Sequence, residues 1–134
     1  MQLVAIRIAH QPGFDRLVFE FGPSALGSPG IPAYSIESSG ALAGASGQAV
    51  PIAGNALFGI RFQNSSTRSP SDGSATYTGS TDLRPTTPLL REVRLVDDFE
   101  RVLVWGAGTD RLACPAVLTL VSPVRVVLDF LTPP

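Results

Sequence analysis

Alternation of apolar and polar side chains with a period of two recurs along this chain, and it limits the possible folds more than any other feature. Such alternation is typical of strands that bury one face of a sheet. Helical periodicity is almost absent, and the 12 prolines disfavour helices further. Eight stretches predict strands: 3–9, 16–21, 34–37, 56–63, 91–96, 101–105, 116–120 and 125–130. Short strands separated by turn-forming residues predict an all-β fold, a two-sheet β-sandwich.

Two irregular segments, 22–48 and 64–88, are rich in Gly, Ser, Pro and Thr. Loops of this length are usually functional or mobile. A chain of 134 residues has the usual length of one domain. We therefore expect a single sandwich domain over residues 1–134, with long Gly/Ser/Pro-rich loops.

The segment 16–21 resembles the segment 125–130 residue by residue. Both begin with Arg, continue with alternating apolar residues, and place an acid before a closing Phe. Strand periodicity puts the apolar side chains on one face and the Arg and acidic side chains on the other. A third copy at 101–106 keeps the first half of the pattern. We interpret the copies as a hairpin unit used more than once, as in sandwiches built from two related sheets.

Composition excludes several classes of partner. The 10 basic residues are all Arg, the formal net charge is -1 and the isoelectric point is near 5.7, so no basic footprint for nucleic acid or an anionic membrane is present. The longest apolar runs are too short to span a bilayer. Cys114 is the only cysteine, which excludes an intramolecular disulfide and a cysteine zinc site. The acids at 97–100 match no calcium loop, so neither a metal nor a cofactor is expected.

Residues suited to catalysis are few. His10 is the only histidine, and no motif around it indicates a triad. Glu20 and Asp129 could lie on neighbouring strands, as the carboxylates of a glycosidase do. Each shares a strand face with an arginine, Arg16 or Arg125, and cross-strand ion pairs are the better interpretation. We therefore expect a chain that is not an enzyme.

Aromatic and planar cationic side chains near loops are the best candidates for holding a ligand, because sugar rings and peptides are bound by stacking and by bidentate donors. The candidates are Trp105, Tyr77, Arg84 and Arg111. Trp105 shares its strand phase with Leu103 and lies opposite Val104. Arg101 shares this phase as well, so Trp105 either lies on the less buried face, where a ligand could meet it, or belongs to the core.

The order of several motifs resembles the AMIN-like domain of actinobacterial secreted proteins and lipoproteins. The motifs are 4–8 and 13–21, which form the first hairpin, then 50–56, 76–79, 91–100, 104–108 and 122–129. No single motif is specific, but their order covers essentially the whole chain. The resemblance implies a β-sandwich.

The related AMIN domain is a non-catalytic module that targets cell-wall amidases and secretion pores to peptidoglycan. The resemblance therefore implies an envelope module that binds peptidoglycan or an associated glycan. The alternative is a protein-interaction or assembly domain of an envelope protein, which docks through an unpaired sheet edge or an Arg-bearing face. The start, Met1-Gln2-Leu3, has no signal-peptide features. We expect a mature extracytoplasmic segment from which the export signal is trimmed.

Overall fold

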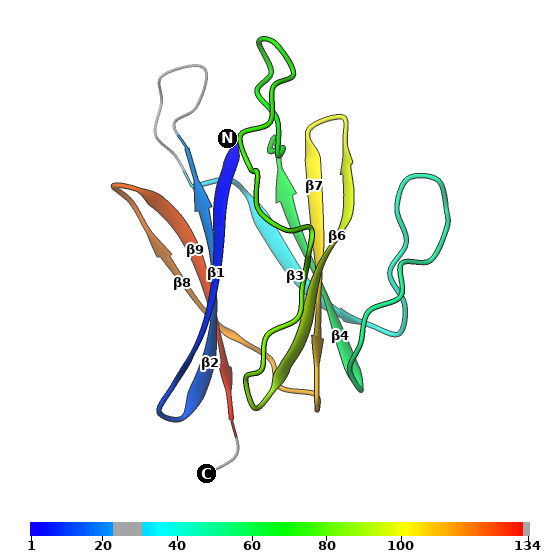
Figure 1. The fold of residues 1–134 in the computed structure, drawn as a ribbon, viewed down its shortest axis with the longest axis vertical. Coiled ribbons are helices and arrows are strands. Elements are labelled where there is room, and N and C mark those ends of the chain that lie inside the picture. Colours follow the sequence, from blue (N-terminus) through cyan, green and yellow to red (C-terminus); the bar gives the residue numbers. More distant parts are fainter. Residues whose placement is uncertain (23–30, 133–134) are drawn as a thin grey trace.

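In the computed structural model, which describes residues 1–22 and 31–132, nine β-strands form two antiparallel sheets (Figure 1). The first sheet has the order β1 (Leu3–Gln11), β2 (Phe14–Phe21), β9 (Val124–Leu131), β8 (Ala116–Leu120). The second has the order β3 (Tyr34–Ser39), β4 (Ala56–Gln63), β7 (Val102–Thr109), β6 (Leu90–Phe99), β5 (Asp82–Leu83). The predicted all-β, two-sheet sandwich is confirmed. No helix in these residues is long and apolar enough to span a membrane.

All eight predicted strands are present. The predicted bounds of β4 and β8 agree with the structure. The other six strands are longer than predicted by one to four residues at one end or at both ends. β7 begins one residue later than predicted. The two-residue strand β5 was not predicted, because it lies inside the irregular segment 64–88 and is too short to show alternation. Within the predicted irregular segment 22–48, residues 23–30 lie outside the described part.

The core lies between the inner faces of the two sheets. Six inner residues of β2 and β9 are at most 2% exposed: Leu17, Phe19, Phe21, Val126, Leu128 and Phe130. Across the interface, the ring centroids of Phe19 and Phe62 lie 5.1 Å apart in an edge arrangement. Each fully buried aromatic side chain of this kind contributes about 1.5–3 kcal/mol. The predicted core face of both sequence copies is confirmed.

The two best copies of the repeated segment are neighbours in the first sheet. β2 and β9 pair with Arg16 opposite Asp129 and Glu20 opposite Arg125. Arg16 forms two hydrogen bonds with Asp129, of 2.8 and 2.9 Å, as predicted for cross-strand pairs. Glu20 instead accepts a hydrogen bond from Arg7 on β1. The third copy contributes β7 to the second sheet, so the repeat is not divided one copy to each sheet.

The segment 40–55 covers part of the outer face of the second sheet. Leu42 and Ile52 approach Gly106 on β7 so closely that a Cβ atom there would lie 2.2 Å from Ile52 Cδ1 and 2.8 Å from Leu42 Cδ1. At Gly108 a Cβ atom would lie 1.8 Å from the backbone oxygen of Ala53. We call this segment the cover. Because of the cover, β7 is buried on both faces.

Candidate binding site on the second sheet

Trp105 lies in the core. Its exposed fraction is 0%, and its ring packs against Phe19 of the opposite sheet at 6.1 Å between centroids. The strand phase shared with Leu103 is the inner one, while Val104 and Gly106 face the cover. The alternative left open by the sequence is thus decided in favour of the core, and the indole is not placed to stack on a ligand at the surface.

Tyr77 is also buried, with an exposed fraction of 8%. Its ring meets Trp105 edge-on at 5.8 Å and 88°, and its hydroxyl donates a short hydrogen bond to the backbone oxygen of Ser80. Burial raises the pKa of the Tyr77 hydroxyl. Two of the four predicted ligand-binding residues therefore lie together, but as core residues that support the segment before β5.

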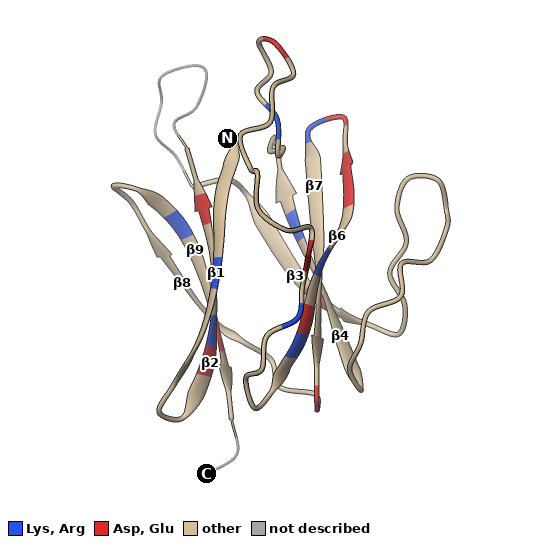
Figure 2. Ribbon diagram, in the orientation of Figure 1, with Lys and Arg blue, Asp and Glu red and all other residues tan. Residues whose placement is uncertain are grey.

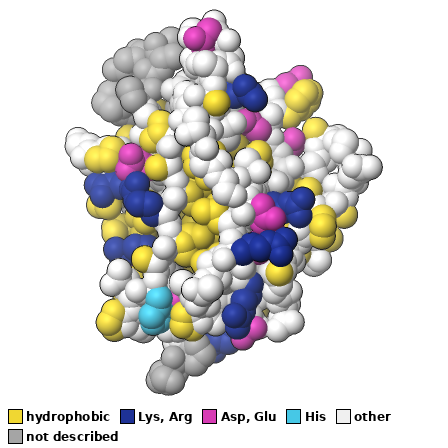
Figure 3. Space-filling view, in the orientation of Figure 1, with side chains coloured by type: hydrophobic (Ala, Val, Ile, Leu, Met, Phe, Trp, Pro, Cys, Tyr) yellow, Lys and Arg dark blue, Asp and Glu magenta, His cyan; other side chains and the backbone are white. Residues whose placement is uncertain are grey.

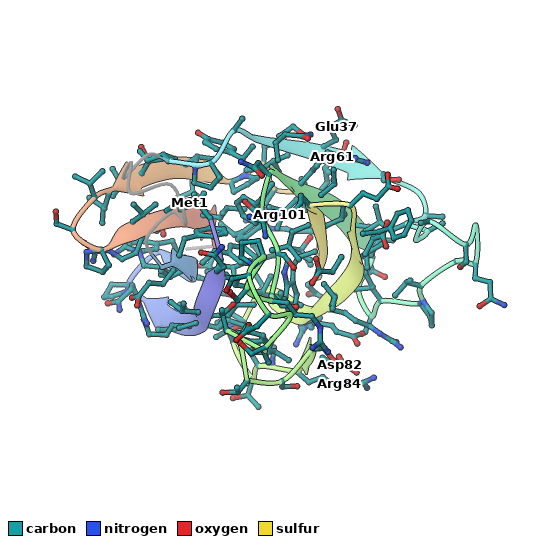
Figure 4. The ribbon with its side chains drawn as sticks, turned by 90° about the horizontal axis from the view of Figure 1, so that it is seen from above. Met1, Glu37, Arg61, Asp82, Arg84 and Arg101 are labelled. Atoms are coloured by element: carbon teal, nitrogen blue, oxygen red, sulfur yellow. The ribbon has the colours of Figure 1, made fainter. Side chains whose placement is uncertain are left out.

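Arg84 is the predicted residue that the structure places in a polar cluster on the surface. Its side chain is 67% exposed, and Nη2 lies 3.3 Å from Asp82 Oδ2 and 3.5 Å from Glu92 Oε2. Arg94 faces Asp82 in the register of β5 and β6. We call these four residues, Asp82, Arg84, Glu92 and Arg94, the outer-face cluster. Figure 4 shows Asp82 and Arg84 together at one side of the molecule, away from Glu37 and Arg61.

Two carboxyl groups of the cluster, those of Asp82 and Glu92, are placed to share one proton. Asp82 Oδ1 and Glu92 Oε2 are both buried, and neither has a hydrogen-bond partner when both groups are ionised. Burial, and then the hydrogen bond to Asp82, raises the pKa of Glu92. The same hydrogen bond lowers the pKa of Asp82, and Arg84 lowers it further. A proton on Glu92 that is donated to Asp82 satisfies both oxygens and removes a like-charge contact.

The outer-face cluster also holds the cover in place. Glu92 Oε1 accepts a 2.7 Å hydrogen bond from the backbone nitrogen of Ala53, and Arg94 donates one of 3.1 Å to the backbone oxygen of Pro51. Glu92 is only 2% exposed although its side chain points to the outer face. The cluster therefore has a buried side, which fixes the segment 51–53, and an exposed side formed by Arg84.

Arg84 can bind an anion from solvent. A guanidinium that is held by carboxylates keeps N–H donors for a further planar acceptor, such as a peptide carboxylate. Figure 2 shows basic and acidic residues in close succession along β6, and Figure 3 shows their side chains gathered on this face.

Arg111 is exposed and donates a 3.4 Å hydrogen bond to the backbone oxygen of Leu131. In the described part of the chain no hydrogen bond or ion pair joins it to the outer-face cluster. Arg91, on β6, contacts Asp110 next to it at 3.3 Å. The four predicted ligand residues therefore do not form one site.

His10 and Asp15 form a second polar pair at the first hairpin. His10 Nδ1 lies 2.7 Å from Asp15 Oδ1, and Asp15 Oδ2 accepts hydrogen bonds from the backbone nitrogens of Leu89 and Leu90. Burial alone would raise the pKa of Asp15, but hydrogen bonds from Leu90, His10 and Leu89 outweigh it and the pKa is lowered. Asp15 thus connects β2 to the start of β6 in the other sheet.

Further hollows lie elsewhere on the surface. An apolar cavity of about 640 Å³ lies at one end of the first sheet, where Phe21, Val121 and Val124 are among its lining residues and Glu20 supplies a charge. A polar hollow of about 120 Å³ is lined by Glu37 and Arg61 among others. Ligand pockets usually measure about 300–1,000 Å³, so the smaller hollow is too small for a sugar residue.

Sequence reasoning missed Asp82, Glu92 and Asp15. Asp15 could have been paired with His10, because a tight turn at Pro12-Gly13 places these two residues opposite each other in the hairpin. No local signal identifies Glu92 as buried, since the cover that buries it lies about 40 residues earlier in the chain. The acids near 97–100 contribute Asp98, which binds Ser66 and Thr67 and thereby fixes the neighbouring loop.

The comparisons with known proteins agree with the resemblance in the sequence. A family model of the AMIN-like domain matches residues 1–132. No curated protein and no solved structure is significantly similar to the chain. The match spans all nine strands and the outer-face cluster. This chain belongs to the AMIN-like domain family.

Proposed function

We propose that this chain is a non-catalytic, extracytoplasmic module of the cell envelope that binds the cell wall, through peptidoglycan or an associated glycan. The observation that carries the proposal is the family match over residues 1–132, because the related AMIN domain targets proteins to peptidoglycan. The partner in this proposal is a wall polymer, and no cofactor takes part.

Arg84 supplies the main contact in this proposal. Asp82 and Glu92 orient its guanidinium, and the group is 67% exposed, so its free donors can bind a carboxylate of a cell-wall peptide. Trp105 and Tyr77 lie in the core, which argues against recognition of sugar rings by these aromatic side chains. The polar peptide part of the polymer therefore suits this surface better than the apolar faces of its sugars.

The arrangement around His10 supports a role without catalysis. Within the described residues, its ring is hydrogen-bonded to Asp15 and to no serine, threonine or cysteine side chain. Asp15 is itself bound to two backbone nitrogens, so it orients the start of β6 as well as the imidazole. These contacts therefore include no nucleophile that His10 could activate.

Co-sedimentation with isolated cell wall at low and high salt tests the proposal. We expect the wild-type protein to sediment with the wall and Arg84→Ala to bind about tenfold more weakly, because a charge-assisted hydrogen bond is lost. Arg61→Ala is the matched control, since it removes an exposed arginine from the other side of the molecule (Figure 4), and its binding should be unchanged.

The outcomes separate the function from the site. Absence of wild-type sedimentation at every salt concentration would contradict cell-wall binding itself. Sedimentation that Arg84→Ala leaves unchanged would contradict the role of Arg84 and leave cell-wall binding in place.

A further inference from the structure

The strand β8 forms an edge of the first sheet, with β9 on one side and no strand paired to its other side among the described residues. Figure 1 shows it as the outermost strand of this sheet. An unpaired edge presents backbone N–H and C=O groups that can pair with another strand. β8 is therefore a place where a further strand can be added.

The apolar side chains on both faces of β8 are exposed. Val117 pairs with the core residue Leu128 and faces inward, yet it is 38% exposed. Leu118 faces outward and is 47% exposed, and Val121 just after the strand is 59% exposed. Exposed apolar residues that gather on one element mark an interaction surface more often than single ones do.

No charged residue occurs from 112 to 124, a range that includes all of β8. Figure 2 therefore shows β8 entirely in tan, the colour of uncharged residues. The other three edge strands carry features that oppose pairing. β1 carries Arg7 and a register shift between Leu3 and Ala5, β3 carries Glu37, and β5 has only two residues.

We propose that β8 is the interface through which two copies of this chain associate, by antiparallel pairing of β8 with β8 of the second copy. In a two-fold interface a surface must complement itself. An uncharged strand does so, because no like charges come to lie opposite each other. Pairing about Leu118 places Leu118 opposite itself, Val117 opposite Thr119, and Ala116 opposite Leu120. Each of these pairs consists of apolar or β-branched side chains, which stabilise neighbouring strands.

The resulting assembly joins two four-stranded sheets into one continuous sheet. An interface made by one short strand from each copy belongs to the small class, so we expect reversible association that depends on protein concentration. The outer-face cluster lies on the second sheet and stays accessible in the dimer. Two copies would then present two such clusters, and avidity would strengthen binding to a polymer.

Sedimentation velocity of the full chain at increasing concentration, up to about 1 mM, tests this proposal. We expect a monomer–dimer equilibrium for the wild type. Leu118→Lys should weaken association at least about tenfold, because two like charges meet at the two-fold axis. Ser38→Lys on the exposed edge strand β3 is the matched control, and it should dimerise as the wild type does.

Cross-linking tests the register independently. Opposite residues in antiparallel strands have Cα atoms about 4.5–5.5 Å apart, which a disulfide can bridge. In a Cys114→Ser background, Leu118→Cys should form an interchain disulfide on oxidation, whereas Ser38→Cys should not. A wild type that stays monomeric at every concentration, or equal association of the Leu118→Lys variant, would overturn the proposal. Equal cross-linking at both positions would overturn it as well.

Discussion

The outer faces of the two sheets carry similar residues but differ in what covers them. On the first sheet, Arg16 and Asp129 form an ion pair whose side chains remain 37% and 20% exposed. On the second sheet, Glu92 also points outward, yet the cover leaves it 2% exposed. Strand periodicity decides which face a side chain takes. Whether that face meets water depends on a segment far away in the sequence.

The largest effect is expected where the cover touches the sheet. Gly108→Ala places a Cβ atom 1.8 Å from the backbone oxygen of Ala53, so the cover must move. We expect a loss of about 3 kcal/mol in the free energy of unfolding, measured by urea denaturation. Gly40→Ala, which meets no atom within 4 Å, is the matched control and should change stability little. Equal stability of the two variants would show that the cover does not pack on β7.

A smaller effect is expected at the edge of the cover. Glu92→Ala removes the acceptor of the Ala53 N–H and should cost about 2 kcal/mol. Glu92→Gln keeps an acceptor for Ala53 and offers an N–H to Asp82 Oδ1, as the protonated acid does. We therefore expect Glu92→Gln to be at least as stable as the wild type at about pH 8. A loss as large as that of Glu92→Ala would contradict the shared proton.

The shared proton also predicts a pH dependence. Because the pKa of Glu92 is raised in the folded protein, its contribution to stability is complete below the ordinary pKa of glutamate and is lost as the pH rises through the raised value. The pKa of Asp82 is lowered, so its contribution is lost as the pH falls. Glu92→Gln removes the pH dependence that comes from Glu92. Its stability relative to the wild type should rise from about pH 4 to about pH 8, and a constant difference would exclude this.

The smallest effect is expected on the uncovered sheet. Asp129→Ala breaks the ion pair with Arg16, whose side chains are partly in water. Ion pairs of this kind contribute about 0–1 kcal/mol, and the loss should shrink further at high salt. If Asp129→Ala lost more unfolding free energy than Glu92→Ala, the covered face would not be the more strongly stabilised of the two.

The strands could be predicted from the sequence because each alternates or forms a short apolar run between turns. The face of Trp105 could not, since β7 lies between the core and the cover and is apolar in both phases: Leu103 and Trp105 inward, Val104 outward. Period-two patterns locate a core only when one face is polar. Trp105 is buried by Phe19 of the opposite sheet, whereas the cover buries the other face of β7.

The candidate site shows the same limit. Arg84 could be selected from the sequence as a planar donor near a loop, and the structure places it in a polar cluster. Its partners could not be selected, because β5 has two residues and no pattern, and because Glu92 resembles a surface residue in the sequence. Long-range contacts of irregular segments decide both where β5 forms and whether Glu92 is buried.

The most direct test of the central claim, that the outer-face cluster meets the cell wall, is a map of amide chemical-shift changes when soluble peptidoglycan fragments are added to labelled protein. We predict that the changes concentrate at residues 82–84, 91–94 and 51–53, and that Arg84→Ala needs about tenfold more fragment to reach them. Changes confined to the uncovered face of the first sheet, or no changes at all at saturating fragment, would contradict the claim.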